Sequence, residues 1–426
     1  MDIGIITRII ISKILKKTKE STISLDECFD IAIKNRNLAI VDKRFIYNVC
    51  ITTIRNINTI EQILDIFTNK LNKKDISYFL ILSSLCQIFY LNQKSYAVIN
   101  SACEAHKEMN LNKSTKFING LLRNIDRNKN IIKFNKLTKS KHPNWFKKNL
   151  KNLSSAKRKT IYKSINQKPS LHINFKNVND IKLFKDKYIK TSSNSISTKQ
   201  ELIVSEINGY KEGRWWVQDY AATIPVKLMG DVYNKRILDM CAAPGGKTFQ
   251  LIHKRARVTS YDVSQKRIDL MKENAKRLKY KIDIIKSDIL KIPEKDKYDV
   301  VLLDAPCSST GTIKKNPEIL YRNTKPNLKF FTDIQYKMLI KASKLIRKNG
   351  FIIYSVCSFF EEEGSKQIEK FLSKYNNFII KKITNSESKK FPRLVTNQGY
   401  FQSYPNDLIN LGGIDGFFIA RITKIK

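Results

Sequence analysis

The chain has 426 residues, which is more than one hydrophobic core usually serves, and this length predicts two or three domains. Hydrophobic residues make up 42% and charged residues 27%, as in a globular protein, and the absence of an apolar run of 18 residues argues against a membrane protein. The formal net charge of +41 favours a polyanionic partner such as nucleic acid, although the joint abundance of Lys, Asn and Ile also fits an AT-rich genome.

The seven cysteines are widely spaced without a Cys-x-x-Cys pair, and the four histidines are scattered. This pattern indicates neither a zinc site nor a disulfide framework, so we expect no bound metal and free thiols. The first helical segment, Met1 to Lys16, lacks a small-residue cleavage site. We therefore expect a cytoplasmic protein.

Residues 1–128 have apolar positions at spacings of three and four, with almost no Gly or Pro, which predicts a bundle of amphipathic helices. The predicted helices are Ile3–Lys17, Leu25–Lys34, Asp42–Arg55, Ile60–Leu71, Ile76–Tyr90, Ser95–Met109 and Ser114–Ile125. The cysteines of this part are interpreted as small buried hydrophobic residues, namely Cys28, Cys50, Cys86 and Cys103.

Residues 131–200 are strongly basic, with only two acids, Asp180 and Asp186. Aromatic residues are interleaved with the lysines: Phe134, Trp145, Phe146, Tyr162, Phe175 and Phe184. A basic surface with stacking side chains is what single-stranded RNA needs. The alternative is a Lys-rich connector whose aromatic side chains face its own core.

A short apolar strand, Ile237 to Met240, runs into a turn at Pro244 to Gly246, and helical apolar spacing follows from Lys247 to His253. Glycine lets a ligand approach the main chain, and the first turn of a helix offers free N–H groups. The pattern predicts a site for a nucleotide-like ligand. A plain strand-turn-helix linker is the alternative.

Further strands end in acids at regular intervals along the chain. Val258 to Asp262 and Asp299 to Asp304 are predicted strands, and Asp288 follows the segment Ile282 to Ile285. The carboxyl ends of parallel strands meet at one edge of a sheet, where a carboxylate can accept hydrogen bonds from ribose hydroxyls. We expect Asp239, Asp262, Asp288 and Asp304 to surround one crevice.

The rest of the chain continues the alternation of helices and strands. The predicted elements are a helix at Leu328–Arg347 stopped by Gly350, a strand at Phe351–Val356, a helix at Glu361–Lys374, and strands at Phe378–Ile383 and Gly416–Ile422. This order predicts a doubly wound α/β sheet.

Three segments resemble the signature motifs of the S-adenosylmethionine-dependent RNA cytosine-C5 methyltransferases, the Fmu/Sun or NOL1/NOP2/Sun family: DMCAAPGGKT, LLDAPCSSTGT and YSVCSFFEEEG. Two N-terminal phrases, VDKRFIYNVCITTIR and KFINGLLRNI, are similar to a NusB-like domain. Nearly the whole chain resembles the bacterial 16S rRNA enzymes of this family, which carry such a domain in front.

The resemblance implies a multidomain fold, an all-α NusB-like bundle followed by an α/β Rossmann-like methyltransferase domain. The implied domains are a NusB-like RNA-binding domain at 1–128, a basic linker and RNA-binding subdomain at 129–210, and the methyltransferase domain at 211–426. S-adenosyl-L-methionine is the implied cofactor. Its implied binding residues are Cys241, Ala242, Ala243, Pro244, Gly245, Gly246, Lys247, Asp262, Asp288 and Asp304.

The resemblance also assigns catalytic roles. Cys357 matches the cysteine that attacks C6 of cytosine, and Cys307 matches the second cysteine, which helps to release the product. Asp304 is expected to hold the edge of the cytosine ring. A cation near Cys357 would favour its thiolate, with Lys247 and Lys314 as candidates.

Details of the motifs add further expectations. The run from Lys314 to Pro317 is expected to grip RNA phosphates, and Gln218 with Asp219 resembles a family segment that lies beside the cofactor. Trp215 or Trp216 could stack on a flipped base, although a core role is favoured. Val356 stands where relatives usually have Thr.

Other functions remain open at this stage. The pair Pro306-Cys307 also fits the nucleophile of DNA cytosine methyltransferases, but the chain lacks their Glu-Asn-Val triplet. A tRNA or 23S rRNA substrate, or a non-catalytic ribosome-assembly factor, is the alternative to an enzyme acting on 16S rRNA as a monomer.

Overall fold

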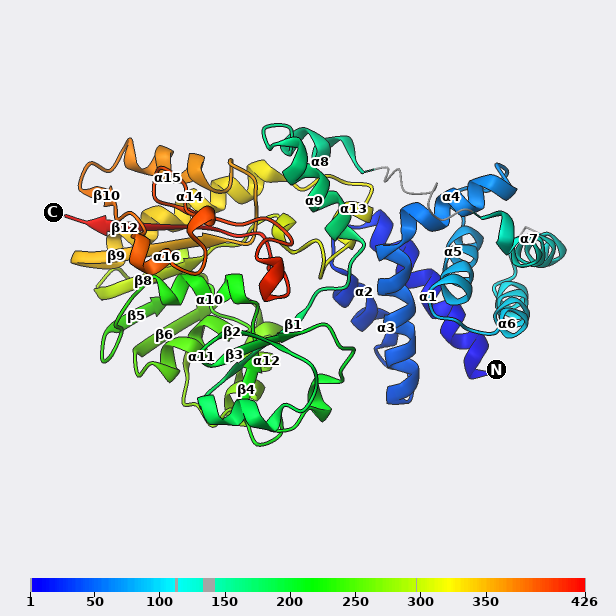
Figure 1. Ribbon diagram of the computed structural model, residues 1–426, viewed down its shortest axis with the longest axis horizontal. Helices are drawn as coiled ribbons and strands as arrows, with labels where there is room; N and C mark the ends of the chain where they lie inside the picture. The colour runs from blue at the N-terminus through cyan, green and yellow to red at the C-terminus, as the bar shows by residue number, and fades with distance from the viewer. Residues whose placement is uncertain (1, 112–113, 133–141, 296, 426) are drawn as a thin grey trace. The chain divides into compact units, whose positions relative to one another are not determined.

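The computed structural model describes residues 2–111, 114–132, 142–295 and 297–425. The chain forms two compact units (Figure 1). The first comprises Met1–Gln167 and Lys315–Lys325, and the second comprises Lys168–Lys314 and Pro326–Lys426. Within the described ranges, no helix combines the length and the apolar character that crossing a membrane requires.

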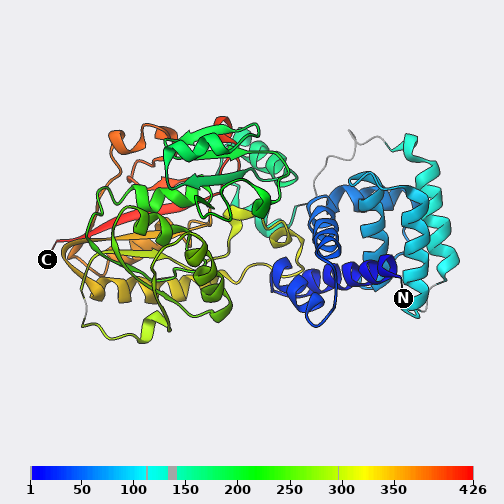
Figure 2. The ribbon, with the colours of Figure 1, turned by 90° about the horizontal axis from the view of Figure 1, so that it is seen from below.

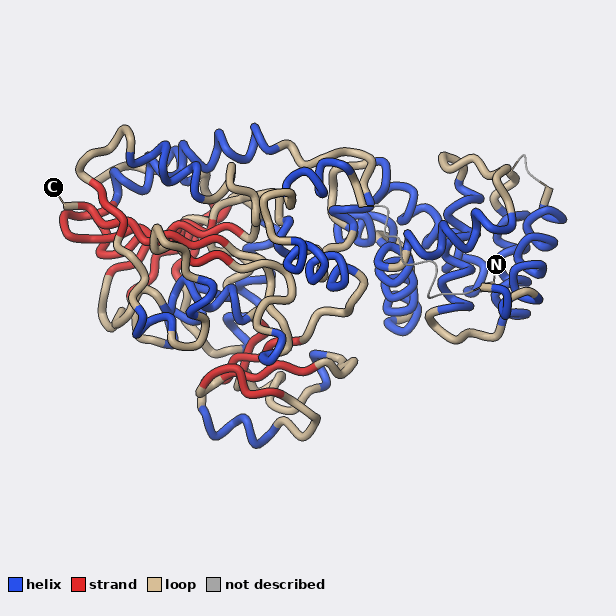
Figure 3. Tube along the Cα trace, turned by 45° about the horizontal axis from the view of Figure 1, so that its top comes forward, coloured by secondary structure: helices blue, strands red, loops and turns tan. Residues whose placement is uncertain are grey.

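The described residues of the first unit form helices joined by loops, with no strand among them, as the blue and tan tube in Figure 3 shows. Its helices are α1 (Ile3–Glu20), α2 (Leu25–Ile33), α3 (Ile40–Arg55), α4 (Ile57–Phe67), α5 (Ile76–Phe89), α6 (Ser95–Glu108), α7 (Thr115–Arg127), α8 (Asn144–Asn149) and α9 (Ser155–Ile165), with a short 3₁₀ turn at Lys129–Ile131. The seven helices predicted for residues 1–128 are confirmed.

Helix α5 forms the centre of this unit. Its residues from Ser77 to Ile88 are all buried, because α1, α3 and α6 pack around it. A helix that is buried on all sides carries apolar or small residues on every face, which explains why α5 lacks charged residues. The four cysteines of this unit lie in its core, as predicted.

The segment Lys315–Lys325, which interrupts the second unit in the sequence, belongs to the first unit. It contains α13 (Glu318–Tyr321), which lies beside α1 and α3 (Figure 2, yellow beside blue). Tyr321 is 7% exposed in the helical core, and its hydroxyl donates to the Leu15 carbonyl at 3.5 Å. The backbone N–H of Asn323 donates to the Lys19 carbonyl at 2.9 Å. Both contacts lie within the helical unit.

The second unit is built on an eight-stranded sheet. The strand order is β10-β12-β9-β8-β5-β6-β7, and β11 also pairs with β12. The bounds are β5 (Arg236–Asp239), β6 (Arg257–Asp262), β7 (Asp283–Lys286), β8 (Tyr298–Asp304), β9 (Ile346–Val356), β10 (Phe378–Ile380), β11 (Phe401–Gln402) and β12 (Phe418–Lys424). Strands β5 to β9 are parallel to one another, and β12 joins β9 in the antiparallel direction.

Helices cover both faces of this sheet (Figure 1). They are α10 (Tyr220–Lys227), α11 (Gly246–His253), α12 (Gln265–Arg277), α14 (Leu328–Leu345), α15 (Ser365–Leu372) and the short α16 (Asn385–Ser388). Side chains alternate along strand β8: Val301 and Leu303 pack with α14, whereas Val300 and Leu302 face α10 and α11. The doubly wound sheet is therefore as predicted, with one antiparallel strand, β12, lying between β9 and β10.

A separate four-stranded sheet belongs to the same unit, with the order β2-β3-β1-β4 (Figure 3). Its strands are β1 (Leu171–Phe175), β2 (Ile189–Ser192), β3 (Ser195–Thr198) and β4 (Trp215–Val217). Phe175, Phe184 and Trp215 form its core, at 5% exposure or less. Phe146 is also fully buried, in the first unit. These aromatic side chains pack inside the protein and do not offer a stacking surface, whereas Phe134 lies outside the described residues.

One sequence expectation needs adjustment here. The helix predicted to reach Arg347 ends at Leu345, because Ile346 is already extended and begins β9. Asn349, with a positive φ of 61°, lies where the register between β9 and β8 shifts. The predicted middle domain, 129–210, runs from the first unit into the second at Lys168. Its role as an RNA-binding subdomain stays a prediction.

Replacing Tyr321 tests whether α13 is part of the helical core. We expect Tyr321→Ala to destabilise the first unit by about 3 to 5 kcal/mol, since a large buried ring is lost. Tyr321→Phe should cost under about 1 kcal/mol, because the hydroxyl bond is long. Urea unfolding followed by circular dichroism measures both, with Tyr96→Ala as control, since Tyr96 is 63% exposed on α6. Equal effects of Tyr321→Ala and Tyr96→Ala would contradict the assignment.

Candidate active site

The Gly-rich turn joins the end of β5 to the start of α11. Gly245 has a φ of +105°, and a Cβ at this position would lie 2.6 Å from the Phe249 ring, so only glycine fits. The Ala242 N–H donates to the Tyr261 carbonyl at 2.9 Å, which ties the turn to β6. The turn therefore holds a fixed shape at the carboxyl edge of the sheet.

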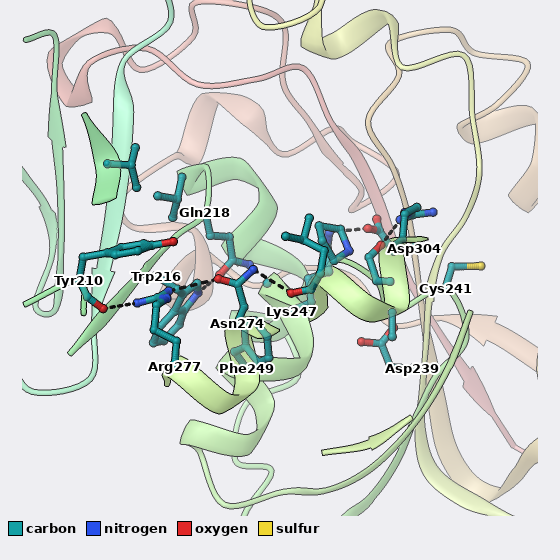
Figure 4. Close-up of a pocket in the computed structure, with 18 residues that line it drawn as sticks. Tyr210, Trp216, Gln218, Asp239, Cys241, Lys247, Phe249, Asn274, Arg277 and Asp304 are labelled. Atoms are coloured by element: carbon teal, nitrogen blue, oxygen red, sulfur yellow. Dashed lines mark hydrogen bonds and ion pairs between the residues drawn. The ribbon is translucent and has the colours of Figure 1, made fainter. Parts of the chain in front are cut away.

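A cavity of about 420 Å³ opens over this turn (Figure 4). The residues that line it are Val204, Tyr210, Trp216, Val217, Gln218, Asp239, Cys241, Ala242, Ala243, Pro244, Gly246, Lys247, Phe249, Arg267, Leu270, Asn274, Arg277 and Asp304. Its volume and its mixture of apolar walls with a few polar groups are typical of small-molecule sites. Most of the predicted cofactor residues lie here.

Asp239 is a buried acid in this cavity. It is 1% exposed, and its Oδ2 accepts from the Thr248 hydroxyl at 2.7 Å. Burial raises the pKa of Asp239 to about 7, with Asp304 and Asp262 adding repulsion. Its Oδ1 is buried and accepts no hydrogen bond from the described residues. This oxygen is a ready acceptor for a cationic or hydroxyl group of a ligand.

Asp304 ends β8 and is held from two sides. The Lys247 ammonium donates to Oδ2 at 2.5 Å, and the Ser355 hydroxyl donates to Oδ1 at 2.8 Å. Lys247 comes from the first turn of α11 and also lies 5.4 Å from the Phe417 ring centre. These two bonds fix the position of the Asp304 carboxylate.

The two cysteines that follow β8 and β9 lie together. Their Sγ atoms are 3.4 Å apart, and Cys357 Sγ lies 3.6 Å from the Ser309 hydroxyl. The hydrogen bond from Cys307 lowers the pKa of Cys357, with Ser309 and Lys247 adding to this effect against burial and the Asp304 charge. The same bond and burial raise the pKa of Cys307. Cys357 is therefore the thiol of this pair that ionises first.

The loop that carries Cys307 is packed tightly against its neighbours. The Gly311 N–H donates to the Cys357 carbonyl at 3.0 Å, and the Gly311 carbonyl accepts from Gly416 at 2.9 Å. A Cβ on Gly311 would lie 1.9 Å from the Gly416 carbonyl oxygen. The backbone at Gly311 approaches that of Gly416 too closely for any side chain.

Other predicted residues lie at the same sheet edge but outside the cavity lining. Asp262 is buried and accepts from the N–H groups of Ala243 at 3.1 Å and Ser264 at 3.0 Å. Asp288 accepts from the Leu290 N–H at 3.0 Å and begins a short 3₁₀ turn. Both carboxylates bond backbone N–H groups. Of the four acids expected to surround one crevice, Asp239 and Asp304 line the cavity.

Lys314 differs from the expectation. It is 5% exposed, and its ammonium donates to Asn406 at 3.3 Å, so it is not part of an exposed phosphate-binding surface. Of the two cations proposed to act on Cys357, Lys247 is the one whose charge lowers the pKa of that thiol. Lys315 follows at the start of the segment that belongs to the helical unit.

One wall of the cavity had not been predicted. Arg267, Leu270, Asn274 and Arg277 follow one another at spacings of three and four on α12, so they share one face of that helix. This spacing was visible in the sequence, but it does not show which partner the face meets. Trp216 is 3% exposed, in line with the favoured core role, and still contributes to the cavity lining.

Comparisons with known families divide the chain in the same way. Residues 227–423 match the model of the family described as 16S rRNA methyltransferase RsmB/F, and residues 6–127 match the model of the NusB family.

Curated relatives match over most of their length. Ribosomal RNA small subunit methyltransferase B of Proteus mirabilis is 29% identical over 362 residues, covering 79% of this chain and 85% of the relative. The protein of the same name from Shewanella oneidensis is 25% identical over 403 residues, covering 90% and 91%. Its namesake from Pasteurella multocida is 27% identical over 410 residues, covering 90% and 89%.

Solved structures share the fold. PH0851 covers 100% of this chain and 99% of its own, with a TM-score of 0.74 and 19% identity. NSun6 from Pyrococcus horikoshii, solved with SFG, covers 67% of this chain and 98% of its own, with a TM-score of 0.56 and 18% identity. The predicted fold, a NusB-like helical domain followed by an α/β methyltransferase domain, is confirmed.

The raised pKa of Asp239 predicts a dependence of stability on pH. Between about pH 4 and 7 the unfolded chain has released this proton while the folded chain keeps it, so folding loses stability as pH rises through this window. Asp239→Asn removes that loss. We expect the variant to gain on the order of 3 to 4 kcal/mol over wild type from pH 4 to 7, measured by urea unfolding. Parallel curves for the two proteins would contradict the burial argument.

Proposed function

We propose that this chain, whose residues 227–423 match the family described as 16S rRNA methyltransferase RsmB/F and whose residues 6–127 match the NusB family, methylates C5 of a cytosine in 16S rRNA. The proposed cofactor is S-adenosylmethionine, and the proposed intermediate is a covalent bond between Cys357 and C6 of the base. The observation that carries the proposal is the pair of thiols, 3.4 Å apart, beside the Lys247–Asp304 ion pair.

The cavity fits S-adenosylmethionine in size and chemistry. Its volume of about 420 Å³ accommodates a nucleoside with an amino-acid chain, and the N-terminus of α11 offers N–H groups to a carboxylate. The buried Oδ1 of Asp239 suits the ammonium of such a ligand. The main chain of residues 241–247 would hold the ligand. Asp262 is the acid proposed to bind its ribose. When bound, S-adenosylmethionine supplies an electrophilic methyl group whose bonding electrons stay with its sulfur.

The proposed reaction begins with the Cys357 thiolate. C5 of cytosine is a weak nucleophile, so its electron density must first be raised. The sulfur adds to C6 and forms the S–C6 bond, and the electron pair of the C5–C6 double bond becomes available at C5. The lowered pKa of Cys357, with the Cys307 hydrogen bond as its main cause, supports this role.

Asp304 is proposed to hold the edge of the cytosine ring while this addition occurs. Its two oxygens are fixed by Lys247 and Ser355, so the carboxyl group does not have to reorient as charge develops on the ring. A protonated Asp304 carboxyl group would stabilise negative charge at N3 of the base. An ionised carboxylate would instead accept a hydrogen bond from the exocyclic amine of the base. Either role requires the position that the ion pair fixes.

Release of the product is the proposed role of Cys307. Once Cys357 is bonded to C6 it is no longer a thiolate, so the hydrogen bond to Cys357, the main cause of the raised pKa of Cys307, is lost together with the Cys357 charge. Cys307 can then ionise and accept the proton from methylated C5. The C5–H electrons restore the C5–C6 double bond, and the S–C6 bond breaks with its electrons returning to Cys357.

RNA is the proposed substrate for three reasons. The net charge of +41 favours a polyanion, the matched family is described as acting on 16S rRNA, and the relatives carry the name of ribosomal RNA small subunit methyltransferase B. The target base must be unpaired or flipped out to reach the thiols. The alternatives, a tRNA or 23S rRNA substrate, are distinguished by which RNA accepts the methyl group.

Substitution of each cysteine tests the proposed chemistry. We expect Cys357→Ala to reduce methyl transfer from labelled S-adenosylmethionine to protein-free 16S rRNA by at least about 1,000-fold, since the attacking group is lost. Cys307→Ala should accumulate a covalent RNA adduct that migrates with the protein on denaturing gels. Cys103→Ala is the control, because this thiol lies in the core of the helical unit and has no proposed role in the reaction.

The opposite pattern would contradict these assignments. Methyl transfer by Cys357→Ala together with its loss in Cys307→Ala would assign the attack to Cys307. An unmethylated RNA with wild-type protein, in spite of cofactor binding, would favour a non-catalytic assembly factor.

Cofactor binding is tested by Gly246→Ala. The atoms nearest to a Cβ at Gly246 belong to the Gln218 side chain, at an ordinary contact distance of 3.5 Å, so the variant should fold but place a methyl group against a residue that lines the cavity. We expect S-adenosylhomocysteine at 100 times its Kd to stabilise wild type by about 2.7 kcal/mol and the variant by much less. Thermal unfolding measures both, with Gly120→Ala on α7 as control, where a Cβ meets nothing within 4 Å. Equal stabilisation of all three proteins would place the ligand elsewhere.

A further inference from the structure

Glu363 is a fully buried acid beside the cysteine pair, at 0% exposure. Its Oε1 accepts from the Ser308 N–H at 2.8 Å, and its Oε2 accepts from the Ser308 hydroxyl at 2.5 Å. Ser308 directly follows Cys307. A buried carboxylate is costly unless its oxygens are hydrogen-bonded, and here both oxygens bond one residue of the cysteine loop.

Two further side chains complete this arrangement. The amide of Gln335, itself fully buried, donates to Glu363 Oε1 at 3.2 Å and to the Pro306 carbonyl at 2.9 Å. The Tyr354 hydroxyl donates to the backbone carbonyl of Glu363 at 2.6 Å. Residues on both sides of Cys307 are thus fixed to Glu363, directly or through Gln335.

The charges around the two thiols differ. The charge of Glu363, which bonds the residue after Cys307, raises the pKa of Cys307, after the larger effects of the Cys357 hydrogen bond, of burial and of the Cys357 charge. The Asp304 charge raises the pKa of Cys357, and the Lys247 charge lowers it. Tyr354, whose hydroxyl bonds the Glu363 carbonyl, stays protonated because burial raises its pKa.

We propose that the Glu363 carboxylate keeps the proton on Cys307 and so selects Cys357 as the thiolate of the pair. Glu363 is then a positioning residue: it places the Cys307 thiol as a hydrogen-bond donor and disfavours the alternative in which Cys307 is the anion. The importance of this selection for catalysis rests on the proposed function. The claim that Glu363 keeps the proton on Cys307 concerns the free protein alone.

Alkylation of the free protein tests the proposal without RNA or cofactor. The probe is iodoacetamide, and mass spectrometry gives its rate at each cysteine from pH 6 to 10. In wild type, Cys357 should react first. Glu363→Gln keeps the size of the side chain but removes its charge, so the ratio of Cys357 to Cys307 alkylation should fall by at least about tenfold. The control is Glu362→Gln, since the Glu362 side chain is 44% exposed and pairs with Lys366; it should leave the ratio unchanged.

A second variant separates charge from anchoring. Ser308→Ala removes the hydroxyl bond to Glu363 and leaves the carboxylate in place. If the charge selects the thiolate, this variant keeps the wild-type ratio or raises it. A fall in the ratio in Ser308→Ala would assign Glu363 a purely structural role and overturn the proposal, even where Glu363→Gln fails to fold.

The methylation assay adds a kinetic readout. Glu363→Gln is expected to lower kcat for 16S rRNA methylation by at least about tenfold with KM for RNA unchanged, because the effect lies in the thiolate population. An unchanged alkylation ratio in folded Glu363→Gln would refute the proposal whatever the RNA assay gives. Failure of wild type to methylate RNA, with the ratio shifted as expected, would instead refute the proposed function only.

Discussion

The pairing of strands β8 and β9 is the constraint on which the site depends. The two strands are adjacent and parallel, with Asp304 opposite Ser355, so the residues after them leave the sheet side by side. Cys307 and Cys357 come two or three residues beyond that pair, and their sulfurs lie 3.4 Å apart. The Ser355 hydroxyl bonds Asp304 across the same strands. The backbone register thus brings both thiols and the acid together.

Three carboxylates then give the site its chemical asymmetry. Asp239 accepts one hydroxyl and keeps one buried oxygen without a partner among the described residues, Asp304 is held between Lys247 and a hydroxyl, and Glu363 bonds the loop that carries Cys307. Asp239 and Glu363 are buried, Asp304 is partly exposed, and each has different partners. Since a charge in such surroundings acts strongly on its neighbours, these partners decide where protons and ligands bind.

The sequence was sufficient for the elements whose pattern is local. The helices of the first unit, the Gly-rich turn and the acids that follow the strands could be read from apolar spacing and turn residues. Contacts with distant partners could not. The segment 318–321 reads as part of a loop, and nothing local shows that Tyr321 packs among helices some 300 residues earlier. Three consecutive acids resemble a solvated surface, so the burial of Glu363 was not visible either. Lys314 was expected at an exposed surface, because its sequence neighbours do not show that it is buried against the distant Asn406.

The most direct test of the account uses RNA in which the target cytosine carries fluorine at C5. After addition and methyl transfer, C5 carries fluorine in place of the hydrogen that a base would remove as a proton. Fluorine cannot leave in that way, so the enzyme stays bonded to C6. We predict that wild-type protein and S-adenosylmethionine form a stable RNA–protein adduct, and that peptide mass spectrometry places the bond on Cys357. An adduct on Cys307 would contradict the assigned roles. Methylation of unmodified RNA without any adduct on the fluorinated RNA would contradict the covalent mechanism itself.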